Sequence, residues 1–442
     1  MKDKVLIRGG CVLTLGAKTT NYPQADVLVE SGRVAEIGTG LRSRDAEVVD
    51  ATNTIVMPGF VDSHRHAWKS LFRNLGETGS SNGVPVSAEV YGPHYSPEDV
   101  YAATLIGLLG AVEAGITTVV DWSDIAPEPA HIEAALEAHN DAGLRTVFVH
   151  AVPEWAQTGH PPGLGGLNLD SARDHRTAVS HAFGSPDPVR SGIDRFGGDW
   201  ESAREKGLRI HAHVGSDPSQ KGVVSQLAQR GLLGGDVTLI HCSHLDASEL
   251  DAIAAHKTPV VLAPSSEMAG GKAMPPIQDL IDRGIRPGLG VDSERVTPGD
   301  IFAQMRATNS VQHATHFDLK LAGKGGLPNL LTTREVIRFA TVDGARAAGL
   351  GDITGSLEPG KQADIVVLRT DRPNIWPIND PIGAVVWGMD TSNVDWVLAG
   401  GRVLVREGEL TADVSRARDL AMTAQVRVAV PAGLMPVSGG GV

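Results

Sequence analysis

Segments typical of β-strands alternate with segments typical of helices from about residue 56 to about residue 350. A strand, a helix and a further strand in succession are typical of a parallel sheet. Eight such units fit a closed (β/α)8 TIM-like barrel better than an open doubly wound sheet, and no GxGxxG motif follows an early strand. The eight strand candidates are 55–61, 116–120, 146–151, a weak one at 189–193, 208–214, 237–241, 259–263 and 286–291.

One of these units shows the helix and strand signals together, in the stretch SPEDVYAATLIGLLGAVEAGITTVVDW. Ser96 can cap a helix, and Pro97 suits its first position because proline lacks the amide hydrogen that would be unpaired there. Gly115 can end the helix, and the next strand follows directly. We therefore expect a helix from Pro97 to just before Gly115.

Both ends of the chain consist of short β-rich runs separated by Gly, Asn and Asp turns. Examples are ADVLVESGRVAEIG near the start and VDWVLAGGRVLVREGEL near the end. These runs predict an antiparallel sheet, and we expect both termini to build one small β-sandwich domain from residues 1–56 and 355–442, with the barrel at 57–354.

Composition limits the partners and the location of the protein. The formal net charge of −13, without a basic block, argues against nucleic acid and against an anionic membrane surface as partners. No apolar run reaches the roughly 18 residues of a membrane span, and the start MKDKVLIRGG lacks a signal-peptide core. We expect a cytoplasmic homo-oligomer, a dimer or tetramer, that acts on a small molecule.

The stretch PGFVDSHRHAWKS places His64 and His66 at the end of the first strand candidate. Residues i and i+2 of a strand face the same side, so both imidazoles would project from the same rim. Imidazole nitrogen is a common ligand of Zn²⁺. An isolated H-x-H pattern is, however, more often core or surface filler than a ligand pair.

Three further strand ends carry residues of the same kind. RIHAHVGS contains His211 and His213, LIHCSH contains His241 and His244, and GLGVDS ends with Asp292. Parallel barrel strands end at one rim, where barrel enzymes have their active sites. This agreement between distant segments favours a metal site over filler.

The chain resembles the amidohydrolase superfamily, in its cytosine deaminase, S-adenosylhomocysteine deaminase and triazine hydrolase branch. The resemblance rests on MPGFVDSHRHAWKSLFRNL, RIHAHVG, LIHCSHL, GLGVDS and ATVDGARAAGLGDITGSLEPGKQADIVVL, and it covers nearly the whole chain. It implies one divalent metal ion bound by His64, His66, His213 and Asp292. Zn²⁺ is the expected metal, with Fe²⁺ and Mn²⁺ as alternatives, and His241 would lie near the metal-bound water and the substrate.

The expected chemistry is hydrolysis by a metal-bound hydroxide, because a divalent ion lowers the pKa of its bound water. Asp292 would accept and return a proton, and His241 would stabilise developing negative charge. No lysine stands near the end of the fourth strand and no carboxylate ends the third, so a single metal is favoured over a bridged pair.

Other side chains are candidates for substrate binding. Trp68 and Arg73 follow the first histidines, Trp122 follows the second strand and Trp155 the third; each has core packing as its alternative. His244 would reach the site if the chain bulges after His241.

One position departs from the resembled branch. Its deaminases carry a glutamate three residues after the strand-five histidine, whereas this chain has Ser216. A hydroxyl cannot shuttle a proton as a carboxylate does. Asp217 and Glu267 are the candidates to replace that glutamate.

Together these patterns predict a metal-dependent hydrolase of a C–N bond, a deaminase-like enzyme acting on a small, cyclic, nitrogen-rich substrate. A dehalogenating hydrolase, or one that opens a cyclic amide or imine, is the alternative within the same fold. A non-catalytic barrel scaffold is the contrasting class.

Overall fold

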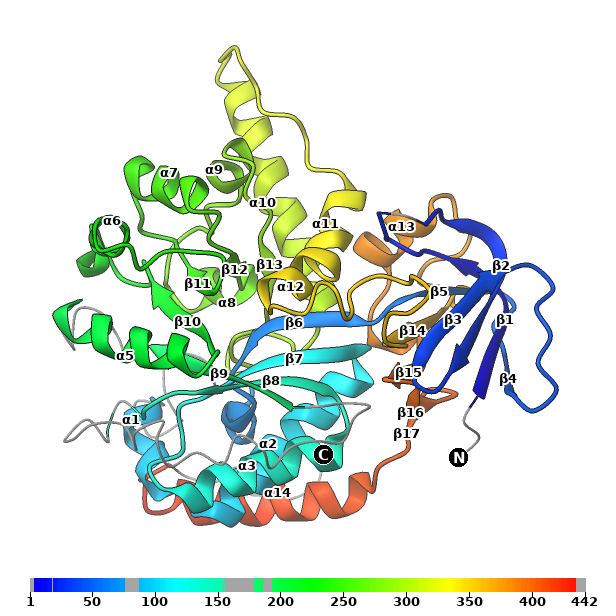
Figure 1. The fold of residues 1–442 in the computed structure, drawn as a ribbon, viewed down its shortest axis with the longest axis horizontal. Coiled ribbons are helices and arrows are strands. Elements are labelled where there is room, and N and C mark those ends of the chain that lie inside the picture. The colour runs from blue at the N-terminus through cyan, green and yellow to red at the C-terminus, as the bar shows by residue number, and fades with distance from the viewer. Residues whose placement is uncertain are drawn as a thin grey trace.

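A computed structural model of the chain describes residues 4–17, 19–75, 87–153, 155, 179–185 and 193–434. It contains two sheets, an eight-stranded parallel sheet surrounded by helices and a nine-stranded sheet beside it (Figure 1). This is the expected fold class, a (β/α)8 barrel with a β domain built from both termini. The expected division at residues 56 and 354 stays a prediction.

The barrel strands run in chain order around the sheet. They are β6 (Phe60–Arg65), β7 (Ile116–Ser123), β8 (Arg145–His150), β9 (Val179–Ser185), β10 (Arg209–Val214), β11 (Val237–His241), β12 (Val260–Leu262) and β13 (Gly288–Leu289). The last strand meets the first where the Asp292 amide donates to the His64 carbonyl at 2.8 Å and the His66 amide to the Asp292 carbonyl at 2.8 Å. Gly290 permits this approach, because a Cβ there would lie 2.6 Å from the His64 carbonyl oxygen.

Helices follow most of the barrel strands and cover the barrel from outside (Figure 1). They are α1 (Ala88–Tyr91), α2 (Pro97–Glu113), α3 (Pro129–Ala142), α5 (Ile193–Glu205), α6 (Val223–Gln229), α7 (Ala247–Ala255), α8 (Pro264–Ala269), α9 (Ile277–Asp282), α10 (Ile301–Leu321), α11 (Thr333–Phe339) and α12 (Val342–Ala347). The 3-10 helix η1 (Ala67–Phe72) comes directly after β6. Helix α2 begins as expected, with the Ser96 side chain accepting the Asp99 amide, and Gly115 follows it at φ 82°.

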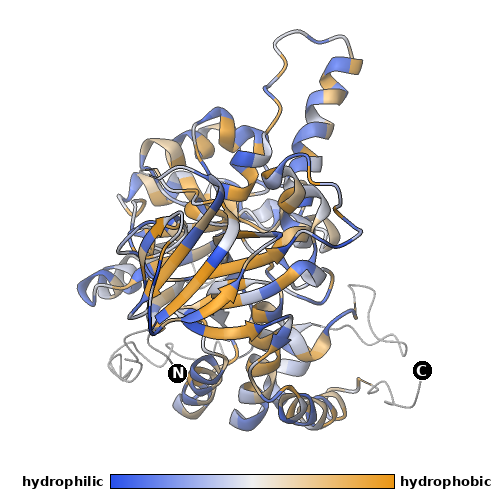
Figure 2. Cartoon of the chain, turned by 90° about the vertical axis from the view of Figure 1, so that its right-hand side faces the viewer, coloured by the Kyte–Doolittle hydropathy of each residue, from blue (hydrophilic) through white to orange (hydrophobic). Residues whose placement is uncertain are grey.

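The terminal sheet combines strands from both ends of the chain. It contains β1 (Lys4–Val12), β2 (Tyr22–Glu30), β3 (Arg33–Gly38), β4 (Glu47–Asp50), β5 (Thr54–Pro58), β14 (Ile365–Arg369), β15 (Val394–Ala399), β16 (Arg402–Arg406) and β17 (Glu409–Leu410). Strand β1 pairs in parallel with β4 and β5, so the sheet is mixed where an antiparallel one was expected. Its strands are largely hydrophobic (Figure 2), and alternate residues such as Ile365 and Val367 fill a separate core. The short α13 (Pro381–Gly383) and the C-terminal α14 (Val414–Ala429) complete the fold.

Two strand predictions were wrong. The segment 55–61 is not one strand, because the chain leaves the terminal sheet after Pro58 and enters the barrel at Phe60. The fourth barrel strand is β9 and not 189–193; of that range only Ile193 lies within the described residues, and it begins α5.

Alternate residues of β7, β8, β9 and β11 point into the barrel and pack together, among them Val120, Val147, Ala182 and Ile240. The barrel interior is therefore filled below its rim, and chemistry is confined to the carboxyl ends of the strands. Within the described part of the chain, no helix combines the length and the apolar character that crossing a membrane requires.

Candidate metal centre

His64 and His66 lie at the carboxyl end of β6, with rings 5.0 Å apart between centroids. His64 stands on the strand itself and is fully buried, whereas His66 lies one residue past its end and begins η1. The i, i+2 spacing therefore brings both imidazoles to the same rim, as the strand alternation predicts.

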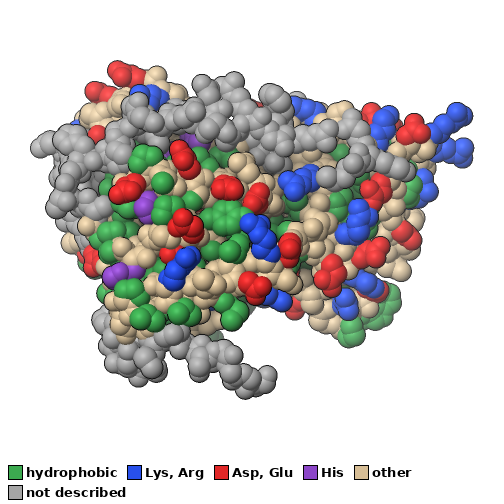
Figure 3. Space-filling view, turned by 90° about the horizontal axis from the view of Figure 1, so that it is seen from below, with side chains coloured by type: hydrophobic (Ala, Val, Ile, Leu, Met, Phe, Trp, Pro, Cys, Tyr) green, Lys and Arg blue, Asp and Glu red, His purple; other side chains and the backbone are tan. Residues whose placement is uncertain are grey.

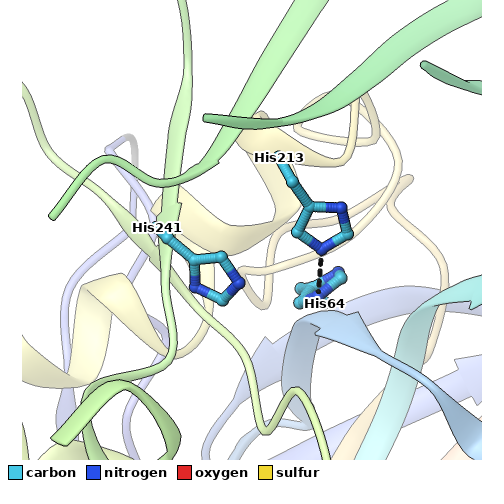
Figure 4. A group of neighbouring side chains, drawn as sticks. All are labelled: His64, His213 and His241. Carbon is cyan, nitrogen blue, oxygen red and sulfur yellow. Dashed lines mark hydrogen bonds between the residues drawn. The ribbon is translucent and has the colours of Figure 1, made fainter. Parts of the chain in front are cut away.

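Three other strand ends complete the cluster. His213 lies near the carboxyl end of β10, His241 is the last residue of β11, and Asp292 follows β13. The Nε2 atoms of His213 and His64 are 3.1 Å apart, and Figure 4 shows His241 turned toward the same space. His241 and Asp292 have φ of 76° and 63°, a left-handed conformation that is uncommon without glycine and often found at active sites.

The possible metal-binding atoms form two groups that share His64. One contains His64, His213 and His241, the other His64, His66 and Asp292, and within each the atoms lie within 4.8 Å of one another. Asp292 Oδ1 is 3.6 Å from His64 Nε2 and 3.5 Å from His66 Nε2. Two nitrogen ligands of a tetrahedral zinc ion lie roughly 3.3 Å apart, so the spacing fits a divalent cation.

Burial favours the neutral imidazoles that a metal requires. It lowers the pKa of His64 to about 4 and the pKa values of His213 and His241 well below the ordinary value. Burial alone would raise the pKa of Asp292, but the Lys272 charge and the contact with His64 outweigh it and hold that pKa well below its usual range. At neutral pH His64, His213 and His241 therefore offer bare nitrogens, and Asp292 offers a carboxylate.

The histidine rings are oriented by buried carboxyl groups. Asp124 Oδ1 lies 2.9 Å from His66 Nδ1 and accepts the indole hydrogen of Trp68 at 2.6 Å. Glu267 Oε1 lies 3.0 Å from His241 Nδ1. Contacts of this kind hold a ligand ring in one orientation, so His66 and His241 turn their Nε2 atoms toward the cluster and the cavity.

A second buried network lies behind β6. Arg65 donates to Asp62 at 2.7 Å and to Glu294 at 2.9 Å, and Glu294 also accepts from Ser70 and Arg73 at 2.6 Å each. Burial alone would raise the pKa of Glu294, but Arg65 and Arg73 lower it. The network holds the loop after β13 against η1. Arg73 donates to Glu294 within this network and is not among the residues that line the cavity.

A cavity of about 230 Å³ opens at the cluster. Its described lining residues are His66, Lys69, Trp122, Asp124, Ala151, Val152, Gly184, Ser185, His213, Ser216, Gln220, His241, Lys272 and Asp292. The volume lies below the ~300 Å³ at which pockets for drug-sized ligands begin, so the cavity suits a small heterocycle.

The candidate substrate residues occupy different places. Trp122 lines the cavity, with its ring 4.2 Å from that of His213. Trp68 is buried against Tyr95 and Trp155, and Trp155 packs over Gly92, away from the cavity lining.

The candidate residues that follow strands five to seven also lie in different places. Asp217 is exposed and its carboxylate caps the Ser219 amide. The His244 amide donates to the Gly215 carbonyl, and its side chain is not among the cavity lining. Glu267 lies behind His241, and burial raises the pKa of its carboxyl to about 8. Ser216 lines the cavity itself, and its amide donates to Gln220.

Among the described lining residues, sequence reasoning missed five polar side chains: Lys69, Asp124, Ser185, Gln220 and Lys272. Asp124 follows the end of β7 by one residue, so the rim rule that selected Trp122 would also have selected it. Lys272 lies in a loop ten residues after β12, where no periodic pattern marks a functional side chain.

Known proteins resemble this chain over nearly its whole length. The model of the amidohydrolase family matches residues 55–404. The 5'-deoxyadenosine deaminase of Methanothermobacter thermautotrophicus is 27% identical over 92% of this chain and 94% of its own length. A 5-methylthioadenosine/S-adenosylhomocysteine deaminase of Desulfitobacterium hafniense is 28% identical over 94% of this chain and 96% of its own.

Solved structures share the fold. A zinc-bound adenosine deaminase of Xanthomonas campestris has a TM-score of 0.82 at 20% identity, covering 96% of this chain and 98% of its own. Atrazine chlorohydrolase of Arthrobacter aurescens, complexed with zinc, has a TM-score of 0.80 at 22% identity, covering 95% of this chain and 100% of its own. At these identities the likeness concerns the fold alone.

Proposed function

The chain belongs to the amidohydrolase family and is a hydrolase of carbon–nitrogen bonds other than peptide bonds; from this premise we propose that it is a deaminase-like enzyme acting on a small, cyclic, nitrogen-rich substrate. The observation that carries the proposal is the convergence of four strand ends on one cluster of imidazoles and a carboxylate beside a cavity. The deaminase names of the relatives support the reaction class.

His64, His66, His213 and Asp292 would hold one divalent metal ion, and Zn²⁺ is the proposed metal. Nitrogen and carboxylate donors in this number suit zinc, with Fe²⁺ and Mn²⁺ as alternatives. When bound, the ion would supply an activated water and polarise the group under attack. The spacing of the donor atoms supports this assignment.

Asp292 is positioned to move a proton. Its Oδ1 atom faces His64 and His66, whereas its Oδ2 atom accepts from Ser266 at 2.7 Å and Lys272 at 2.6 Å. The low pKa keeps Asp292 ionised, so its carboxylate would offer Oδ1 to the metal and act as the proton acceptor, while Ser266 and Lys272 hold Oδ2 in place. His241 borders the same cavity, and its Nε2 atom would contact the reacting group.

Ser216 stands where the resembled deaminases carry a glutamate, and no glutamate is among the described residues that line the cavity. Asp217 is exposed, and Glu267 reaches His241 and not the cavity, so neither borders the space where a substrate ring would lie. We therefore propose a substrate that needs no protonation at a ring nitrogen, such as an imine, an amidine or an activated heteroaromatic ring. Trp122 would stack on that ring.

Ammonia release tests this function. Purified enzyme, loaded with Zn²⁺ and checked for metal content, is incubated with triazines, pterins, purines, pyrimidines and cyclic amidines. Ammonia formation that stops after chelation and returns with added metal supports the proposal. Halide or ring-opened product without ammonia establishes the alternative hydrolases, and a protein that binds no metal and turns over none of them would be a scaffold.

The expected compartment is the cytoplasm and the expected assembly a homodimer or homotetramer. Cell fractionation and light scattering of the purified protein test these two expectations.

A further inference from the structure

The described residues around the cavity include two ammonium groups, Lys69 and Lys272, and two carboxylates, Asp124 and Asp292. Both carboxylates already have partners. Asp124 contacts His66, Trp68 and Lys69, the last at 3.9 Å, while Asp292 contacts Ser266 and Lys272. No acidic group of the described lining is therefore left to receive a cationic substrate.

Lys272 contacts Asp292 through the Oδ2 atom, whereas His64 and His66 lie near its Oδ1 atom. Its ammonium lies 2.6 Å from Asp292 Oδ2 and 3.2 Å from His241 Nε2, whereas the metal side of the carboxylate is Oδ1. The Lys272 amide donates to the Glu267 carbonyl at 2.9 Å, which ties the loop to α8. The ammonium thus contacts Asp292 and His241, which both line the cavity, and 27% of the Lys272 side chain is exposed.

The charge of the cavity follows from these groups. Among the described lining residues the two ammonium groups balance the two carboxylates, so a bound divalent cation would give this part of the site a net positive charge, even after a bound hydroxide has reduced it by one. A partly enclosed site of one sign attracts substrates of the opposite sign. In addition, Ser216 removes the carboxylate that would have repelled an anion.

We propose, resting on the proposed function, that Lys272 binds an anionic oxygen of the substrate, so that this hydrolase acts on nitrogen heterocycles bearing a carboxylate or an acidic ring oxygen. Lys272 is then a residue that determines specificity. An ammonium donates short, charge-assisted hydrogen bonds to such oxygens, and these are stronger than bonds between neutral groups.

The test is binding, which needs no turnover. Titration calorimetry on the zinc-loaded full chain compares pyrimidine-4-carboxylate with its uncharged analogue pyrimidine-4-carboxamide, in the wild type, Lys272→Met, Lys272→Arg and, as a matched surface control, Lys324→Met. We expect the wild type to prefer the carboxylate by about tenfold or more. Lys272→Met should lose that preference at unchanged metal content, whereas Lys272→Arg and Lys324→Met retain it.

Two outcomes overturn the assignment: a wild type without preference for the anion, or a preference that survives in Lys272→Met, which would arise at the metal. Metal content and thermal melting of each variant identify any that fails to fold. If Lys272→Met fails to fold, the anion preference of Lys272→Arg decides whether the assignment holds. A carboxylate preference in an enzyme that releases no ammonia would reject the proposed deamination while leaving the role of Lys272 intact.

Discussion

His64 is the residue on which both groups of candidate ligands depend, since its Nε2 atom belongs to each. Its burial keeps the ring neutral, and its carbonyl also accepts the Asp292 amide that closes the barrel. One residue therefore links the backbone closure of the fold to the chemistry at its rim.

Replacing this imidazole should remove the metal and the activity together. We expect His64→Ala to contain less than a tenth of the metal of the wild type and to lose activity by about a thousandfold or more, because a ligand shared by both groups is missing. Elemental analysis and an ammonia assay measure the two effects. His256→Ala, at an exposed histidine, is the control, and a fully active, metal-loaded His64→Ala would contradict the assignment.

A second histidine pair lies on the outer side of the barrel, away from the metal centre. His150 Nε2 is 2.9 Å from His181 Nδ1. Burial, together with the charge of His181, lowers the pKa of His150 to about 3, and burial lowers the pKa of His181. Because the folded protein binds these protons less tightly than the unfolded chain, the pair costs stability as pH falls below about 6.5.

This pair should contribute to acid sensitivity. Between pH 7 and pH 5 we expect His150→Gln to lose about 2 kcal/mol less unfolding free energy than the wild type, since one proton uptake at the pKa of the unfolded chain is removed. Denaturant unfolding at pH 5, 6 and 7 measures this difference. His256→Gln should follow the wild type, and equal pH slopes for all three proteins would show that the pair is not involved.

At the scale of elements, the junction between β5 and β6 decides how the two sheets meet. Gly59 separates them, and its amide donates to the Asp364 carbonyl at 3.0 Å. A Cβ at this position would overlap the Thr117 side chain of β7, with Thr117 Cβ only 2.7 Å away. The lack of a side chain therefore lets the chain cross from one sheet to the other beside β7.

We expect Gly59→Ala to cost about 1–3 kcal/mol of unfolding free energy, as overpacking of a filled site does. Thr117→Gly in the same chain should recover part of that loss by vacating the space. Gly235→Ala, where an added Cβ meets nothing within 4 Å, is the matched control. Thermal melting of the four proteins suffices, and a neutral Gly59→Ala would disprove the packing explanation.

The face formed by α2, α3 and α14 shows how the outer helices pack. Arg427 of α14 donates to the buried Asp99 at the start of α2. Seen from below, acidic and basic side chains lie interspersed among hydrophobic ones on this side of the molecule (Figure 3). The described charges on this face are therefore of both signs.

At the scale of the whole molecule, a buried ion pair joins the barrel to the terminal sheet. Arg145 at the start of β8 donates to Asp364 at 2.8 and 3.2 Å, and Asp364 also accepts the Gly400 amide at 2.6 Å. Both side chains are nearly fully buried. Removing Asp364 would take away the counter-charge that this pair provides to the buried Arg145 guanidinium.

Asp364→Ala should therefore destabilise the protein by about 3–5 kcal/mol, whereas Glu30→Ala, which breaks the exposed Lys4–Glu30 pair, should cost about 1 kcal/mol or less. Denaturant unfolding followed by tryptophan fluorescence compares the two. Equal losses for both variants would show that burial does not set the strength of the Arg145 pair.

Local patterns predicted much of this molecule. The strand 237–241 coincides with β11, the cap at Ser96 begins α2, and the eight-unit alternation leads to the barrel. These features depend on neighbours within a few residues in the chain, where capping geometry and side-chain alternation operate. The convergence of His64, His213 and Asp292 could also be expected, because parallel strands end at one rim.

Other features depend on contacts between segments far apart in the chain. The chain breaks between β5 and β6 at Gly59 because the Thr117 side chain leaves no room for a Cβ there. The two oxygens of Asp292 have different partners because Ser266 and Lys272 donate to Oδ2. Asp217 is exposed because η5 (Pro218–Gln220) turns it away from the cavity. The sequence by itself determined the barrel, its rim and the types of residue gathered there. Only the tertiary structure decided which side chains face the cavity and what charge it carries, because loop conformation and long-range packing leave no periodic signal in the chain.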